Sequence, residues 1–118
     1  MIKNILLVGL GGATGAMLRY GITLLFTFLH WSANVGTLLT NVIGSFIMGM
    51  LVSMFQQSPM LLFATVGLCG GFTTFSTFSM QSVTLLQQGR YGAAALYMLG
   101  TMALCIICAA LGCMVAKQ

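Results

Sequence analysis

Four long apolar segments, separated by short polar breaks, constrain the fold of this chain more than any other feature. They run over residues 4–29, 35–55, 60–87 and 91–116. Each is long enough to cross the hydrocarbon core of a bilayer, which takes about 20 helical residues. Only 3% of the 118 residues are charged, whereas soluble domains are about 25% charged. The sequence therefore predicts an all-α integral membrane protein, a single four-helix transmembrane domain over residues 1–118.

The few charges in the chain are all positive, with four Lys and Arg residues and no Asp or Glu. Without carboxylates, paired-carboxylate catalysis and acidic proton relays are excluded, and we expect no enzyme activity. The positive balance favours anions as partners. The cations are scattered rather than clustered, so we expect no nucleic-acid partner. The four cysteines lie in apolar runs, and buried packing explains them better than metal binding, although Cys105 and Cys108 have metal-ligand spacing.

The orientation of the chain in the membrane is weakly specified. Four spans place both termini on one side, with Lys3 and Lys117, and leave Arg90 on the other side. The positive-inside rule therefore acts on a bias of two charges against one. The chain could insert in either orientation, or the two lysines could hold the termini inside.

Residues 70–79 interrupt the third apolar segment near its middle. Two adjacent glycines are followed by five hydroxyl side chains interleaved with phenylalanines. Glycine lets a backbone leave helical geometry, and unwound backbone in a bilayer is tolerated only where it is buried in protein or lines a polar cavity. We therefore expect the third helix to be broken here, at a functional site.

The chemistry of residues 70–79 suits ions. Unwound carbonyl groups favour a cation such as Na⁺. Hydroxyl groups donate hydrogen bonds to an anion, and the positive ring edges of Phe75 and Phe78 allow a small anion to approach. The alternative is aromatic core packing, with the hydroxyl groups bonded back to their own helix.

Two further polar side chains lie inside the apolar segments. Asn41 offers two donors and one acceptor at midspan, either for an ion or for an interhelical hydrogen bond. Arg19 lies inside the first segment, where a charge marks function unless the side chain extends to the headgroups. The fourth segment carries a narrow stripe of small or weakly polar groups, which taken alone indicates packing more than a pore: Tyr97, Thr101, Cys105, Cys108 and Gly112.

Three motifs together carry a family resemblance. Residues 12–20 read GATGAMLRY, residues 36–46 read GTLLTNVIGSF and residues 67–79 read GLCGGFTTFSTFS. Their order and spacing resemble the CrcB/Fluc family of fluoride channels over nearly the whole chain. The resemblance implies a four-helix subunit in an antiparallel, dual-topology homodimer with two fluoride pathways and a structural Na⁺ at its centre. It also implies passive fluoride export across the bacterial inner membrane, which relieves fluoride toxicity.

The resemblance assigns expected roles to residues that match the family motifs. Phe75 and Phe78 resemble the phenylalanines of the fluoride path, and Asn41 resembles the asparagine beside them. Ser76 and Thr77 resemble the track of hydroxyl groups.

Further roles come from the ends of the motifs and from the fourth segment. Gly70 and Thr73 resemble the residues whose backbone carbonyls hold Na⁺. Arg19 resembles an arginine near the aqueous vestibule. Tyr97 and Thr101 align with pore-lining positions of the fourth helix.

Two positions depart from the family pattern. Gln81 stands where the family commonly has Glu, and Cys105 stands where Ser is often found. One alternative to a fluoride channel is a small dual-topology multidrug-type transporter, which normally needs a membrane carboxylate. Another is a non-transporting membrane subunit held by its glycine-rich faces.

Overall fold

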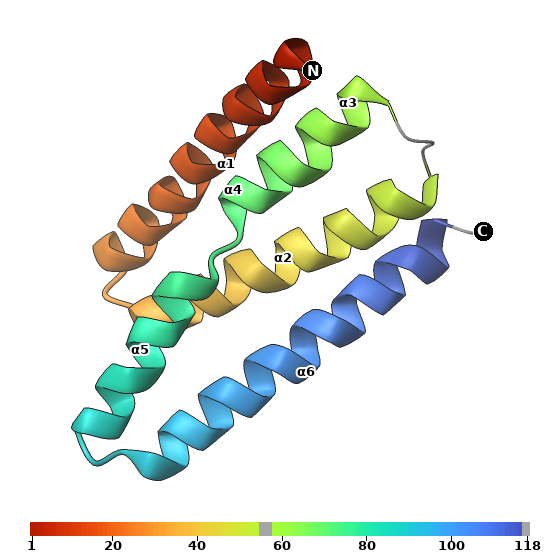
Figure 1. Ribbon diagram of the computed structural model, residues 1–118. Coiled ribbons are helices and arrows are strands. Elements are labelled where there is room, and N and C mark those ends of the chain that lie inside the picture. Colours follow the sequence, from red (N-terminus) through yellow and green to blue (C-terminus); the bar gives the residue numbers. More distant parts are fainter. Residues whose placement is uncertain (55–57, 117–118) are drawn as a thin grey trace.

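The computed structural model describes residues 1–54 and 58–116, and every regular element among them is a helix (Figure 1). The elements in chain order are α1 (Ile2–Phe28), α2 (Ala33–Met54), α3 (Pro59–Leu62), the π-helix η1 (Phe63–Cys69), α4 (Gly70–Phe72), α5 (Phe75–Gln87) and α6 (Tyr91–Ala116). Four stretches are long and apolar enough to cross a membrane: Ile2–Phe28, Ala33–Met54, Pro59–Gln87 and Tyr91–Ala116. The predicted all-α architecture with four spans is confirmed. Residue 55, which ends the second predicted segment, and Lys117 lie outside the described residues.

Local signals explain where the third span begins. Pro59 occupies the first turn of α3, where no backbone donor is needed. The Ser58 hydroxyl accepts a hydrogen bond from the Leu61 backbone N–H at 3.2 Å and caps the helix. The chain therefore enters the third span within one residue of the predicted position.

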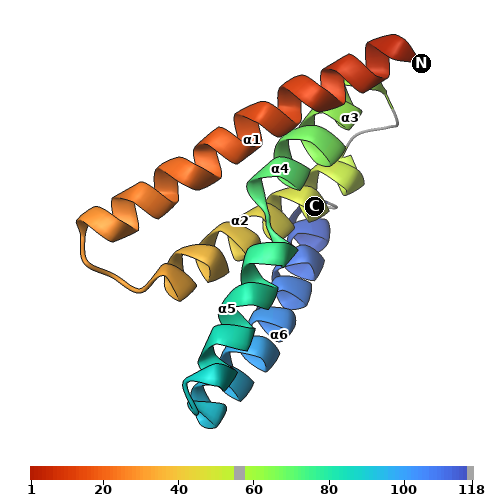
Figure 2. The same cartoon turned by 60° about the vertical axis from the view of Figure 1, so that its left-hand side comes forward.

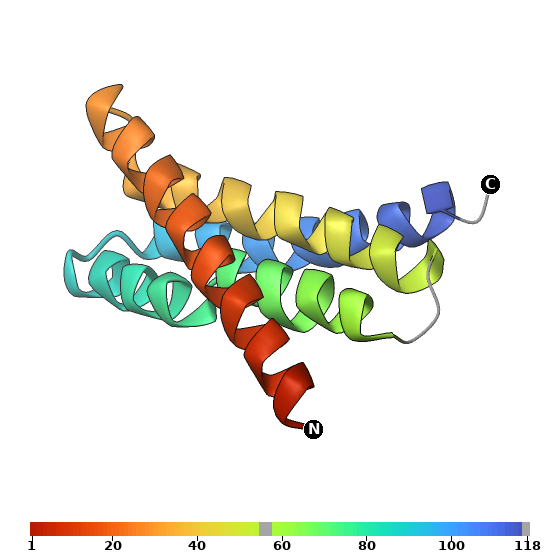
Figure 3. The ribbon, with the colours of Figure 1, turned by 90° about the horizontal axis from the view of Figure 1, so that it is seen from above.

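Helix α1 crosses the third span (Figure 3). The two backbones approach each other at glycines. A Cβ atom on Gly67 would lie 2.8 Å from the carbonyl oxygen of Val8, and one on Gly11 would lie 2.8 Å from the Leu68 nitrogen. Helix α2 packs closely along α6, where a Cβ atom on Gly112 would lie 3.0 Å from the Met50 nitrogen. Close packing through small residues therefore holds both helix pairs together.

The third span is broken at Thr73 and Thr74, between α4 and α5 (Figure 2). Both residues are extended, with ψ of 158° at Thr73 and φ of −148° at Thr74. The predicted break is confirmed, but the paired glycines do not unwind the chain, because Gly70 has helical angles of −61° and −40°. A Cβ atom on Gly71 would instead collide with the backbone of Gly12. Close approach to α1, rather than conformational freedom, accounts for the glycine at position 71.

The α1–α2 and α5–α6 turns lie at the same end of the molecule (Figure 1). Each turn has one residue in the left-handed region, His30 with φ of 61° and Gly89 with φ of 76°. The Arg90 N–H donates to the Leu85 carbonyl oxygen at 3.0 Å, which closes the end of α5. The start of α1 and the end of α6 lie at the other end, as an even number of spans requires.

Candidate functional site

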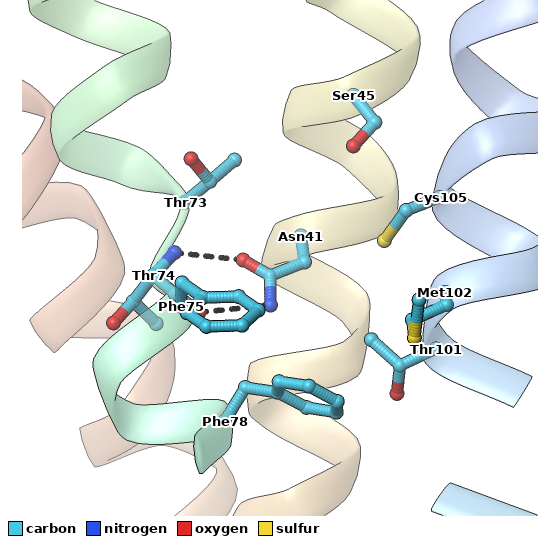
Figure 4. Close-up of a pocket in the computed structure, with 9 residues that line it drawn as sticks. All are labelled: Asn41, Ser45, Thr73, Thr74, Phe75, Phe78, Thr101, Met102 and Cys105. Atoms are coloured by element: carbon cyan, nitrogen blue, oxygen red, sulfur yellow. Dashed lines mark hydrogen bonds between the residues drawn. The ribbon is translucent and has the colours of Figure 1, made fainter. Parts of the chain in front are cut away.

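A cleft of about 230 Å³ opens at the helix break, between α2, α5 and α6 (Figure 4). Residues from all three helices and from the break itself contribute to it. Its lining consists of Asn41, Ser45, Thr73, Thr74, Phe75, Phe78, Thr101, Met102 and Cys105.

Asn41 joins α2 to the break through two hydrogen bonds. Its Oδ1 accepts from the Thr74 backbone N–H at 2.7 Å, and its Nδ2 donates to the Thr74 carbonyl oxygen at 3.1 Å. The pairing fixes the orientation of the amide, because the backbone N–H can face only the oxygen. One amide hydrogen remains for another partner, beside the cleft that Asn41 lines.

The break frees two carbonyl groups from helical hydrogen bonds. In a continuous helix the Thr74 N–H would donate to the Gly70 oxygen, but here it donates to Asn41. The Thr77 N–H would likewise donate to the Thr73 oxygen, but it donates to Thr74 Oγ1 at 3.3 Å. Neutral carbonyl oxygens are suitable ligands for a hard cation. The Gly70 and Thr73 carbonyls therefore fit the cation that the sequence analysis assigned to them.

The start of α5 gathers hydroxyl groups. Thr74 caps the helix, and its Oγ1 donates to Thr77 Oγ1 at 3.1 Å and lies 3.5 Å from Ser76 Oγ. The first N–H groups of a helix have no partner within it and carry the positive end of its dipole. The break therefore places freed carbonyls on one side and anion-favouring N–H and hydroxyl groups on the other.

Three aromatic rings form a row from the cleft along α5 and α6. The ring centroids of Phe75 and Phe78 are 5.6 Å apart, and those of Phe78 and Tyr97 are 5.2 Å apart. Both pairs are tilted by nearly 50°, so ring edges as well as faces are presented to neighbours. The Tyr97 hydroxyl donates to Gln81 Oε1 at 2.6 Å. This hydrogen bond was not predicted, although the sequence analysis singled out Gln81.

The cleft is open on one side of the chain. Phe78 is 7% exposed, whereas Phe75, one turn away on the same helix, is 77% exposed. Thr101 is 5% exposed, and among the described residues its Oγ1 has no hydrogen-bond partner. An unpaired buried hydroxyl is costly, so Thr101 offers a donor to whatever occupies the cleft.

Arg19 lies at the break but outside the cleft. Its Nε donates to the Gly71 carbonyl oxygen at 3.2 Å, from α1 to the last turn of α4. The guanidinium therefore meets the negative end of a helical segment, where a cation is favoured. The alternative of an arginine extended to the headgroups receives no support from this contact.

The structure brings most of the sequence-predicted residues together. Five of them line the cleft: Asn41, Thr73, Phe75, Phe78 and Thr101. Ser76 and Thr77 lie next to the cleft, where their hydroxyl groups contact Thr74. The Tyr97 ring packs against Phe78, and Gly70 lies just before the break. Arg19 lies outside the cleft and contacts Gly71. The back-bonding alternative holds for two hydroxyls, since Thr73 donates to Cys69 at 3.1 Å and Ser79 donates to Phe75 at 2.9 Å.

The sequence analysis gave no role to Ser45 or Met102, which line the cleft. It counted Thr74 among the hydroxyl groups that can bind an anion and placed Cys105 in the stripe of the fourth segment, without a pore position for either. Ser45 lies one turn beyond Asn41 on α2, so helical periodicity could have placed it. Thr74 required knowledge of the position of the break. Met102 has no signal of its own, because an apolar side chain on a membrane helix is ordinary.

Comparison with known proteins settles the family. The model of the family described as "CrcB-like protein, Camphor Resistance (CrcB)" matches residues 6–113. The chain belongs to the CrcB-like family. A relative named "Fluoride-specific ion channel FluC", from Campylobacter jejuni, is 45% identical to this CrcB-like chain over 99% of the chain and 100% of the relative. Relatives of the same name from Pseudomonas putida and Cronobacter sakazakii are 43% and 46% identical, over 88% and 81% of the chain and 83% and 80% of each relative.

The cleft of this CrcB-like chain coincides with two of the sequence motifs. Residues 36–46 supply Asn41 and Ser45, and residues 67–79 supply the break and both phenylalanines. The motif at residues 12–20 supplies the glycines and Arg19 that pack behind α4. The three motifs therefore build one site and its support.

Proposed function

We propose that this chain is a fluoride-selective channel that exports fluoride passively across the bacterial inner membrane and thereby relieves fluoride toxicity. The observation that carries the proposal is the cleft at the helix break, where ring edges, hydroxyl groups and the Asn41 amide converge. The relatives named fluoride-specific ion channels support the choice of ion. Neither the cleft nor the sequence offers a carboxylate that would repel it.

Fluoride is small and strongly hydrated, so a pathway must replace its water with donors. The remaining Asn41 N–H, the Thr101 hydroxyl and the unpaired N–H groups at the start of α5 are such donors. Ser76 and Thr77 extend the donors along α5 in this proposal.

The aromatic row accounts for selectivity against larger anions. A ring edge offers only weak positive charge, and a compact ion approaches it most closely. We assign Phe75 and Phe78 to the narrow part of the path and Tyr97 to its continuation. Arg19 contributes positive potential from behind the break and holds the end of α4.

A single subunit leaves the pathway incomplete. Phe75 is 77% exposed, so an anion beside it would face lipid in an isolated chain. A second copy of the chain would cover this side, and the weak charge bias of the loops permits opposed insertion. The functional unit we propose is an antiparallel, dual-topology homodimer with two pores.

A structural Na⁺ at the dimer centre is part of the proposal. The Gly70 and Thr73 carbonyls, both released from helical hydrogen bonds, would hold it with the same groups of the second copy. When bound, the ion would neutralise converging carbonyl dipoles and add positive charge at the break.

The alternative of a small multidrug-type transporter is not supported. The family model and the named relatives point to a fluoride channel instead.

Fluoride efflux from liposomes, followed with a fluoride electrode, tests the proposal. Phe75→Ile, Phe78→Ile and the double variant should abolish efflux while size-exclusion chromatography still shows the dimer. Phe28→Ile is a matched control, because Phe28 is 79% exposed on α1 and does not line the cleft. Efflux unchanged in the double variant would overturn the assigned pathway.

A further inference from the structure

A second polar recess lies at the end of the molecule where the α1–α2 and α5–α6 turns meet. Its volume is about 230 Å³, and no comparison assigns it a role. Polar side chains dominate its lining: Ser32, Asn34, Gln81, Thr84, Gln88 and Arg90.

The recess contains one of the four cations of the chain and no acidic group. The Thr84 hydroxyl is committed to the Met80 carbonyl at 2.9 Å, and Ser32 Oγ accepts from the Asn34 N–H at 3.2 Å. The Ser32 O–H, the side-chain amides and the Arg90 guanidinium therefore remain as donors in the lining of the recess.

The backbone fixes the position of Arg90. Gly89 adopts a left-handed φ of 76°, and the Arg90 N–H donates to the Leu85 carbonyl oxygen at 3.0 Å. The backbone of Arg90 is thus tied to the end of α5, and its exposed side chain starts from a fixed point beside the recess.

The recess and the cleft have no lining residue in common, but a chain of side-chain contacts runs between them. Gln81 borders the recess, and its Oε1 accepts the Tyr97 hydroxyl at 2.6 Å. Because the amide oxygen is engaged by Tyr97, the NH₂ group of Gln81 is left for another partner. The Tyr97 ring in turn contacts Phe78, which lines the cleft.

We propose that the recess is an outer anion-binding site at which Arg90 concentrates small monovalent anions before they pass Gln81 and Tyr97 to the cleft. The site binds anions weakly and does not distinguish fluoride from chloride. It is open to water, and it attracts anions by charge rather than by a set of donors that matches the size of one ion. Its role as an entrance rests on the proposed channel function, whereas its anion binding does not.

Efflux at several ionic strengths tests the role as an entrance. A unit charge at 5–10 Å in water changes local anion concentration by about two- to fourfold. Arg90→Gln should therefore lower fluoride efflux by about that factor in 10 mM salt. The deficit should vanish near 1 M of an impermeant salt, where the screening length falls to about 3 Å.

Matched variants test whether efflux depends on a positive charge at position 90 or only on the net charge of the protein. Arg90→Lys should retain wild-type efflux. Lys3→Gln removes the same charge from a residue that does not line the recess, and it should lower efflux less than Arg90→Gln does. In Arg90→Cys, a cationic methanethiosulfonate reagent should restore efflux and an anionic reagent of similar size should not. Wild-type protein treated with both reagents controls for the native cysteines.

Chloride binding to purified protein is a second readout that needs no transport. Broadening of the ³⁵Cl NMR signal should be larger for the wild type than for Arg90→Gln. Equal broadening overturns the anion site, and equal efflux of wild type and Arg90→Gln in 10 mM salt overturns its role as an entrance. Absence of fluoride efflux from the wild type would overturn the channel function instead, with the NMR result still deciding the anion site.

Discussion

The side-chain amide of Asn41 pairs with both backbone polar groups of Thr74, at 2.7 Å and 3.1 Å. In the bilayer, a break in a helix leaves N–H and C=O groups that water cannot satisfy. Asn41 supplies the missing partner of the Thr74 N–H from the neighbouring helix. It also donates to the Thr74 carbonyl oxygen, which as the N-cap oxygen accepts the first hydrogen bond of α5 as well. The residue that borders the cleft therefore also stabilises the irregular backbone that forms it.

Asn41→Leu should destabilise the protein and abolish fluoride efflux. The variant leaves the Thr74 N–H without a partner, which costs about 1–3 kcal/mol for a buried group. Thermal unfolding in detergent and liposome efflux measure the two effects. Ser45→Ala is the control, since Ser45 lines the same cleft and makes no hydrogen bond to the break. A fully stable Asn41→Leu protein would contradict the role of Asn41 in supporting the break.

Gly15→Ala should loosen the contact between α1 and the third span. A Cβ atom on Gly15 would lie 2.7 Å from the Phe72 nitrogen, and backbone atoms cannot move aside as a flexible side chain can. Overpacking of this kind costs about 1–3 kcal/mol.

Gly9→Ala is the matched control for that variant. It adds the same methyl group to the same helix, and no atom lies within 4 Å of the added Cβ. Its melting temperature should equal or exceed that of the wild type, because alanine favours helix more than glycine does. Equal melting temperatures for Gly15→Ala and Gly9→Ala would show that the close approach is not needed.

The number of spans and their limits could be predicted because hydrophobic length is a local property of the sequence. The exact position of the break within residues 70–79 could not be predicted, since it depends on partners from another helix. Gly70 and Gly71 carry the stronger local signal, yet both are helical. Thr73 and Thr74 leave the helix, where Asn41 and the Thr74 side chain can satisfy the backbone.

The sequence predicted which residues form the candidate site better than it predicted how they are arranged. Asn41, Phe75 and Phe78 do meet at one cleft, as their motifs indicate. The π-helical turns of Phe63–Cys69 have no sequence signal, because an i→i+5 ladder forms from the same residues as an α-helix. The contact of Arg19 with Gly71 depends on the crossing of two helices, which periodicity alone does not give.

Arg19→Gln should lower both stability and efflux, because the variant loses a charge-assisted hydrogen bond to the Gly71 carbonyl oxygen. Hydrogen bonds to charged groups contribute about 1.5–3 kcal/mol. Arg19→Lys keeps the charge but not the planar donor and should recover efflux only in part. Lys3→Gln controls for net charge. If Arg19→Gln were as stable as the wild type, Arg19 would not be needed to stabilise the helix break.

Sodium should stabilise the purified protein relative to an equal concentration of N-methylglucamine, a cation too large for a carbonyl site. A ligand at 100 times its Kd stabilises the folded state by about 2.7 kcal/mol. The effect should follow the cation and not the ionic strength, because the Gly70 and Thr73 carbonyls are neutral ligands. Melting curves in matched salts measure it.

Asn41→Leu tests where the sodium acts. Without the Asn41 amide, nothing from α2 holds the Thr74 backbone in place, so the Gly70 and Thr73 carbonyls on either side of the break are no longer fixed around the cation. The difference between the two salts should therefore shrink in this variant, whereas Ser45→Ala should keep it. A sodium effect of equal size in Asn41→Leu would mean that the cation binds elsewhere, because the helix break would then have no part in holding it.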